Sequence, residues 1–131
     1  ILKIQSDNYA TITGKRMFIV PNILGGATGK LVPDTGRRYD YVVKDAFRHI
    51  DSVEIKIPSG YQPESMPKDV SLETKFGKYT VTVRAKENQI VYMRKMDQYS
   101  GRFPAREYND AVKFYNEVYK ADKGKMVLVK E

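Results

Sequence analysis

The chain contains no cysteine and only one histidine, His49, among its 131 residues. Without a thiol it can form no disulfide and offers no cysteine nucleophile, and its composition indicates neither an oxidising nor a reducing compartment. A single imidazole with no carboxylate cluster at ligand spacing is a poor metal site. No G-x-S-x-G motif presents a serine nucleophile. We therefore predict no catalytic residue, no metal site and no cofactor in this chain.

Long apolar runs are missing too. No stretch approaches the roughly 20 apolar residues that a membrane-spanning helix needs, and no charged-then-apolar leader opens the sequence. We predict no transmembrane segment. The chain begins at Ile1 with residues that already have strand character, and its length suits one domain. We expect residues 1–131 to form a single domain, as a piece of a longer protein whose targeting signal lies elsewhere.

The excess of positive charge is moderate and dispersed. The 23 basic and 16 acidic residues give a formal net charge of +7. The densest basic groups, Gly36–Arg38 and Met93–Lys95, are short and stand among acidic residues. A solvated surface explains this pattern better than a nucleic-acid interface does, so nucleic-acid binding is a weak alternative.

The clearest helix signal covers residues of about 104–121. Pro104 suits a first helical turn because it needs no backbone donor there, and Gly124 can adopt the left-handed turn that closes a helix. Apolar residues recur at three- and four-residue spacing and share one face. That face comprises Tyr108, Ala111, Val112, Phe114, Tyr115, Val118 and Tyr119, and the polar face comprises Arg106, Asp110, Lys113, Glu117 and Lys120. Such a helix must pack on an apolar surface.

Most of the chain before this helix alternates apolar and polar residues, as strands do. The Gly14-Lys15 pair between two such stretches predicts a tight hairpin. The stretch Gln89–Gln98 is apolar on both faces, which favours a central strand covered on each side. The other expected strands are residues 8–13, 16–20, 39–43, 49–57, 70–76, 78–86 and 126–128. The predicted fold class is mainly β: an antiparallel, β-sandwich-like domain with one helix packed on it and a closing strand.

Residues 22–38 are rich in glycine and predict a long surface loop. The run Gly25–Lys30 contains glycines and a lysine, as phosphate-binding loops do. Its spacing does not fit, because Leu24 stands where the first glycine is required and no serine or threonine follows Lys30. A surface loop is the preferred interpretation.

The ten tyrosines allow a ligand-binding interpretation. Aromatic residues gather near the predicted helix, and sugar-binding surfaces use aromatic planes with polar rims. The speculative ligand surface comprises Tyr99, Phe103, Tyr108, Arg37 and Arg38. Packing between helix and sheet is the competing interpretation and the preferred one, because tyrosine can bury its ring and keep its hydroxyl at an edge.

Several short motifs occur in a characteristic order. They are Arg38 before Tyr39-Asp40-Tyr41, the Asp51 strand ending at Ile57-Pro58-Ser59-Gly60-Tyr61, Met66-Pro67, Phe76-Gly77-x-Tyr79, Tyr92-x-Arg94, Gly101-x-Phe103-Pro104, Tyr108, Phe114, and Ala121-Asp122 before Val127-Leu128. In this order the chain resembles the C-terminal domain of unknown function of bacterial transglutaminase-like proteins, which also carry a β-rich domain of unknown function at the N-terminus. The resemblance covers residues of about 18–128.

The resemblance implies a β-sandwich-like domain with a late helix, in an exported protein of the periplasm or cell envelope of a Gram-negative bacterium. The Cys-His-Asp centre of a transglutaminase-like enzyme would lie upstream, since this chain has no cysteine. The expected role is a non-catalytic accessory domain whose partner is the upstream transglutaminase-like domain. The alternatives are a binding module for envelope glycan or peptide and, less favoured, a nucleic-acid binder.

Overall fold

The protein is mainly β, with antiparallel sheets and one long helix in its last third, as predicted. The computed structural model describes residues 3, 5, 9–23 and 31–131. The strands are β1 (Thr11–Thr13), β2 (Arg16–Ile19), β3 (Tyr41–Val43), β4 (Phe47–Lys56), β5 (Tyr61–Ser65), β6 (Val70–Glu73), β7 (Gly77–Lys86), β8 (Gln89–Gln98), β9 (Gly101–Phe103) and β10 (Met126–Lys130). The helices are the 3-10 turn η1 (Ala105–Glu107) and α1 (Tyr108–Asp122).

The strands form three antiparallel sheets. The main sheet has the order β4-β8-β7-β6, the second sheet has the order β1-β2-β10-β5, and β3 pairs with β9 alone. The predicted central strand is confirmed, because β8 lies between β4 and β7 over its whole length. The short strand β9 was not predicted. Its three residues have little pattern of their own, and it is defined by pairing with β3.

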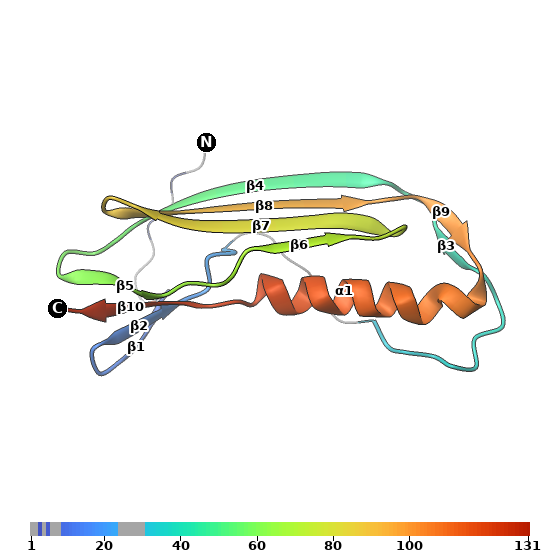
Figure 1. Ribbon diagram of the computed structural model, residues 1–131, viewed down its shortest axis with the longest axis horizontal. Coiled ribbons are helices and arrows are strands. Elements are labelled where there is room, and N and C mark those ends of the chain that lie inside the picture. Colours follow the sequence, from blue (N-terminus) through green and yellow to red (C-terminus); the bar gives the residue numbers. More distant parts are fainter. Residues whose placement is uncertain (1–2, 4, 6–8, 24–30) are drawn as a thin grey trace.

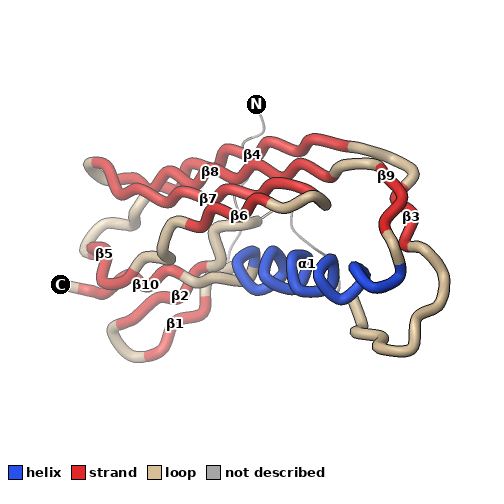
Figure 2. The backbone as a smooth tube through the Cα atoms, turned by 45° about the vertical axis from the view of Figure 1, so that its right-hand side comes forward, coloured by secondary structure: helices blue, strands red, loops and turns tan. Residues whose placement is uncertain are grey.

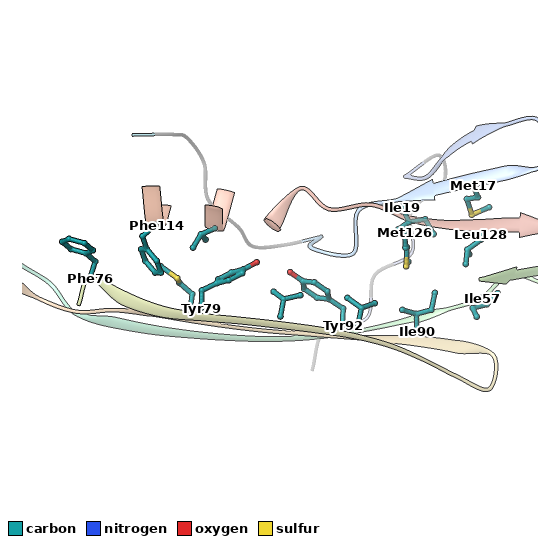
Figure 3. Packing of buried hydrophobic residues seen from close by; sticks show 14 of the residues in the cluster. Met17, Ile19, Ile57, Phe76, Tyr79, Ile90, Tyr92, Phe114, Met126 and Leu128 are labelled. Carbon is teal, nitrogen blue, oxygen red and sulfur yellow. The ribbon is translucent and has the colours of Figure 1, made fainter. Parts of the chain in front are cut away.

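The domain has two layers. The main sheet forms one layer, and α1 followed by the second sheet forms the other (Figures 1 and 2). The core lies between them and includes fully buried side chains from both layers: Tyr79, Ile90, Val118, Met126 and Leu128 (Figure 3). This arrangement confirms the predicted sandwich-like architecture with a helix on the sheet and a closing strand.

The helix lies in the predicted orientation. Ala111, Val112 and Phe114 are buried, with exposed fractions of 0%, 3% and 2%, whereas Lys113 is exposed. The expected left-handed closure at Gly124 is wrong. Lys123 is the C-cap residue of the helix and has a φ of −95°. Gly124, which follows it, does not have a positive φ. A glycine fits there because a Cβ would meet the Ala121 carbonyl oxygen at 3.2 Å and the Pro67 ring.

The expectation that β8 is covered on both faces is also wrong. Its inner face carries Tyr92 and Met96, at 2% and 4% exposed, against α1 and the second sheet. On its outer face Met93 is 47% exposed, and Ile50 of β4 is 63% exposed. Within the described residues this outer face has no second layer, because the only helix and the second sheet lie on the inner side (Figure 1).

The sequence predicted a hairpin at Gly14-Lys15 and a loop over residues 22–38. The hairpin at Gly14-Lys15 is confirmed, and Gly14 has the positive φ of 60° that such a tight turn requires. The loop predicted over residues 22–38 is confirmed for residues 31–38, which contain no strand or helix. Residues 24–30, with the glycine-rich run, lie outside the described residues.

Candidate functional site

An aromatic cluster closes the N-terminal end of α1. It comprises Tyr41 of β3, Phe76 before β7, Phe103 of β9 and Tyr108 of α1. The ring centroids of Phe76 and Phe103 are 4.8 Å apart and those of Tyr41 and Tyr108 are 5.4 Å apart, both in edge-on geometry. Aromatic rings attract each other at such separations because the positive edge of one meets the negative face of the other. The rings therefore pack mainly on one another.

Arg37 lies over this cluster. Its guanidinium carbon is 4.4 Å from the centroid of Tyr108 and 5.7 Å from that of Tyr41. Its Nε donates to the Tyr39 carbonyl oxygen at 3.0 Å, and an Nη donates to that of Asp40 at 3.2 Å. These contacts hold the guanidinium plane against the rings, a cation–π arrangement. The loop is thereby attached to the helix.

The structure brings together three of the five predicted surface residues. Arg37, Phe103 and Tyr108 share the cluster, where both rings are half-buried. Tyr99 is 39% exposed and lines a separate hollow with Phe47 and Asp97. Arg38 is exposed on the loop. For Arg37, Phe103 and Tyr108, this placement favours the interpretation that they pack between helix and sheet. The ligand surface as a whole stays a prediction.

A buried ion pair ties the C-terminal end of α1 to the main sheet. Arg94 of β8 donates to both carboxylate oxygens of Asp122, at 2.6 and 2.8 Å. The Tyr79 hydroxyl of β7 donates to the same carboxylate at 2.7 Å. Arg94 and Asp122 are each 5% exposed, and Asp51 approaches Arg94 at 3.5 Å. A bidentate, fully hydrogen-bonded pair is the form in which charges are tolerated inside a protein.

Burial and charge shift the acid–base properties of this network. Burial alone would lower the pKa of Arg94, but the hydrogen bond and the charge of Asp122 outweigh it and raise that pKa. Burial, together with the hydrogen bond to Asp122, raises the pKa of Tyr79. Both residues therefore keep their protons near neutral pH. The network is suited to fixing the helix on the sheet.

Tyr92 of β8 lies next to this network and differs from Tyr79 in one respect. It is 2% exposed, yet its hydroxyl has no hydrogen-bond partner among the described residues. Figure 3 shows that Tyr79 and Tyr92 are neighbours in the middle of the core, with their hydroxyl ends pointing toward one another. Burial raises the pKa of Tyr92 to about 12, so the hydroxyl stays protonated and can donate.

A hollow of about 370 Å³ adjoins Tyr92 and the C-terminal half of α1. Most of its wall is apolar. The side chains that form it include Pro21, Pro67, Val70, Leu72, Val81 and Ala121. Lys68, Glu117 and Lys120 also line it and are exposed. Small-molecule and peptide sites commonly have this composition, apolar walls with a few polar groups.

A second hollow of about 360 Å³ lies beside the N-terminal half of the helix. Its lining includes Phe76, Lys113 and Phe114, and Glu117 lines both hollows. We refer to the two hollows together as the groove. It runs between α1 and the edge of the main sheet that β6 and the following turn form.

The sequence contained a signal for the buried pair that was not used as a site prediction. Arg94 occupies an inward position in the alternation of β8, between the apolar Tyr92 and Met96. A charged residue at such a position requires a partner. That partner, Asp122, comes from another element, and its identity depends on how α1 packs. The groove could not be predicted from the sequence, because its lining residues come from elements that are distant in the chain.

Other site types are not found in the described part of the chain. Residues 3, 5, 9–23 and 31–131 contain no group of three or more histidine, cysteine, aspartate or glutamate side chains that could hold a metal ion. His49, exposed on β4, lies 4.5 Å from the ring of Phe47. Over the same residues, no helix has the length and hydropathy needed to cross a membrane.

The fold and these sites define a two-layer antiparallel β domain with a helix fixed by a buried ion pair. The sequence matches the family DUF3858, described as a domain of unknown function with a solved structure, over residues 15–128. The chain belongs to this family. No curated protein matches it.

A solved structure has a similar fold. It is the crystal structure of a protein described as a "putative protease" from Parabacteroides distasonis ATCC 8503, with a TM-score of 0.67 and 16% sequence identity. The similarity covers 87% of this chain and 23% of that chain. The chain therefore spans about a quarter of the length of that protein, and at this identity the likeness concerns the fold.

Proposed function

We propose that this chain is a non-catalytic accessory domain that stabilises or positions a transglutaminase-like catalytic domain in an exported protein of the bacterial cell envelope. One observation supports the accessory role above the others: the same fold occurs as 23% of a much longer solved chain. The transglutaminase-like neighbour and the export rest on the motif order from Arg38 to Leu128. Since the chain contains no cysteine, the proposal assigns the thiol nucleophile of such an enzyme to the neighbour.

The outer face of the main sheet is the surface best suited to such a neighbour. It presents Ile50 and Met93, at 63% and 47% exposed, with Thr80 and Thr82 around a shallow hollow of about 250 Å³. Exposed apolar side chains grouped on one sheet face are typical of surfaces that another domain covers. The inner face needs no such cover, because α1 and the second sheet already occupy it.

The test is the thermal unfolding of the longer protein, measured by calorimetry, with and without Met93→Glu. If the outer face packs on the catalytic domain, the wild-type domains unfold together, and the substitution separates the transition into two because it places a charge in the contact. Lys113→Glu, on the solvent face of α1, is the control and leaves one transition. Two transitions already present in the wild type would refute this docking.

A cysteine-directed label tests the other half of the proposal. Iodoacetamide should abolish the transferase or hydrolase activity of the longer protein, while the isolated chain gains no label. Activity that survives complete alkylation would refute a transglutaminase-like neighbour, even if the two domains unfold together.

A further inference from the structure

Within residues 3, 5, 9–23 and 31–131, no strand pairs with the edge of the main sheet next to the groove. Among the described strands, β6 pairs only with β7, with Val70 opposite Val81 and Leu72 opposite Tyr79. The β7 side chains of these pairs are 3% and 0% exposed, whereas Val70 and Leu72 are only half-buried. The sheet thus ends before it covers the adjacent side of α1. An edge strand also presents backbone donors and acceptors to an added strand.

The hollow beside Tyr92 has the size and chemistry to receive one large apolar side chain. Its volume of about 370 Å³ lies directly inward of Val70 and Leu72. A strand added beside β6 would direct every second side chain toward this space. At the inner wall is Tyr92, which is 2% exposed and whose buried hydroxyl has no hydrogen-bond partner among the described residues. An inserted polar atom or an accompanying water could satisfy it.

The mouth of the hollow has a net positive charge. Lys68 and Lys120 are exposed there with one exposed carboxylate, Glu117. The charge of Asp122 is matched by Arg94. The second hollow is lined by Lys75, Lys113 and Asp110. Lys75 is paired with Glu107 at 2.7 Å, and the charges of Lys113 and Asp110 cancel, so this hollow adds no net charge. An acidic residue in the occupant would complement the two lysines.

From this geometry we infer that the groove binds an extended peptide of another polypeptide chain, which adds to β6 as a fifth strand of the main sheet. The peptide places a bulky apolar side chain in the hollow beside Tyr92 and an acidic side chain near Lys68 and Lys120. Main-chain hydrogen bonds to an edge strand supply affinity in this mode of recognition, and a pocket for alternate side chains supplies specificity. This inference is independent of the outer face on which the accessory role depends.

The test selects peptides from a phage-displayed library of random ten-residue sequences on the immobilised 131-residue domain. A selected peptide is then synthesised and added to the ¹⁵N-labelled domain. The enriched sequences should share a large apolar residue with an acidic residue close to it. Amide shifts should cluster on β6 and on the second half of α1. Replacing the shared apolar residue by alanine should weaken binding at least about tenfold, through the lost burial of its side chain.

Two variants locate the site. Ala121→Phe fills the hollow beside Tyr92 and should weaken binding at least about tenfold. An unchanged far-UV circular dichroism spectrum would show that the fold is intact. Lys120→Glu changes only the mouth and should weaken binding about two- to fivefold, the range of an exposed ion pair. Lys125→Glu makes the same charge change at an exposed position outside the groove and should have no effect.

Several outcomes overturn the inference. They are a library that yields no enriched motif, peptides whose shifts map to the loop 31–38 or the outer sheet face, and binding that Lys120→Glu and Lys125→Glu reduce equally. Amide shifts on β6 that change with protein concentration in the absence of peptide would show instead that a second copy fills the groove. Equal binding by the N-acetyl amide of the shared apolar residue would show a small-molecule site without strand addition.

Discussion

The two ends of α1 are attached to the β structure by different means. At the N-terminal end, rings of Tyr41, Phe76, Phe103 and Tyr108 fill the space and Arg37 covers them. At the C-terminal end, Asp122 is bound by charged and polar groups, and a hollow of about 370 Å³ lies beside it. One end is packed by rings, whereas the other is fixed by hydrogen bonds and leaves space open.

The physical reason for the difference is the directionality of the contacts. Aromatic rings attract one another over a range of angles, so they can move until little space is left. A bidentate guanidinium–carboxylate pair has one good geometry, so the Arg94–Asp122 pair fixes the helix end at a set distance from the sheet. Side chains as short as Val70 and Ala121 then do not fill the remaining space. Specific attachment and a vacant pocket thus occur together.

The largest effect is expected from Arg94→Met. This change leaves the carboxylate of Asp122 buried without its cation, which costs about 3–5 kcal/mol of unfolding free energy. Urea unfolding followed by circular dichroism measures the loss. The double variant Arg94→Met with Asp122→Leu removes both charges and should recover most of it. A loss below about 1 kcal/mol in the single variant would show that the pair is not buried in solution.

At the opposite end, Phe103→Ala should cost about 2 kcal/mol, less than a fully buried phenylalanine because the ring is half-buried. The same urea experiment applies. No second substitution should rescue it, since the loss is one of packing and not of an unmatched charge. If Phe103→Ala leaves stability unchanged, the ring is free on the surface, and the predicted ligand surface that includes it becomes the better interpretation.

Two tyrosine variants compare the stability contributed by a hydrogen-bonded hydroxyl with that of a buried hydroxyl that has no partner among the described residues. Tyr79→Phe removes the hydrogen bond to Asp122 and should cost about 1.5 kcal/mol, as for bonds to charged groups. Tyr92→Phe removes a buried hydroxyl without a partner and should be neutral or slightly stabilising. Thermal melts of the two variants under the same conditions compare them. Equal losses would mean that Tyr92 has a partner in solution.

Alkaline pH should test the burial of the Tyr79 hydroxyl. The pKa of Tyr79 is raised in the folded state by burial and by Asp122, so its proton is kept there and lost first from the unfolded chain, near pH 10. Stability is then full below about pH 10 and falls as the pH rises above it. Unfolding free energy measured from pH 8 to 11 should fall less steeply in Tyr79→Phe. An unchanged slope would contradict the burial of this hydroxyl.

The smallest expected effect comes from the loop over the aromatic cluster. Arg37→Ala should cost about 0.5–1 kcal/mol, the range of an exposed cation–π contact. Arg38→Ala is the matched control and should leave the unfolding free energy unchanged, since Arg38 is exposed and outside the cluster. Equal effects of the two changes would mean that general charge, and not stacking on Tyr108, attaches the loop.

Much of the fold could be predicted from local patterns. The helix of about 104–121 is observed at residues 105–122. The strands β6 and β8 fall within the predicted stretches, and β7 begins at Gly77, one residue before the predicted stretch 78–86. The helix faces were also correct, because the spacing of Ala111, Phe114 and Val118 follows the helical period. The closure at Gly124 was wrong, since a glycine is also used where the chain passes close to another segment, here Pro67.

The candidate sites were less predictable. The surface proposed from Tyr99, Phe103, Tyr108, Arg37 and Arg38 divides between a packed cluster, a separate hollow and an exposed loop. Composition and sequence proximity do not determine which faces of different elements meet. The groove and the unpartnered Tyr92 hydroxyl were missed for the same reason.

By itself, the sequence determined the type, order and inward face of the long elements, because hydrophobic periodicity acts over a few neighbouring residues. Strand alternation also put Arg94 on the same face as Tyr92 and Met96, but it did not determine that this face alone would be covered. Only the tertiary structure decided that Asp122 would be the partner of Arg94. It also decided that, within the described part of the chain, β6 is an edge strand and the outer face of the main sheet is uncovered. Such features depend on contacts between residues distant in the chain, such as the 28 positions that separate Arg94 from Asp122.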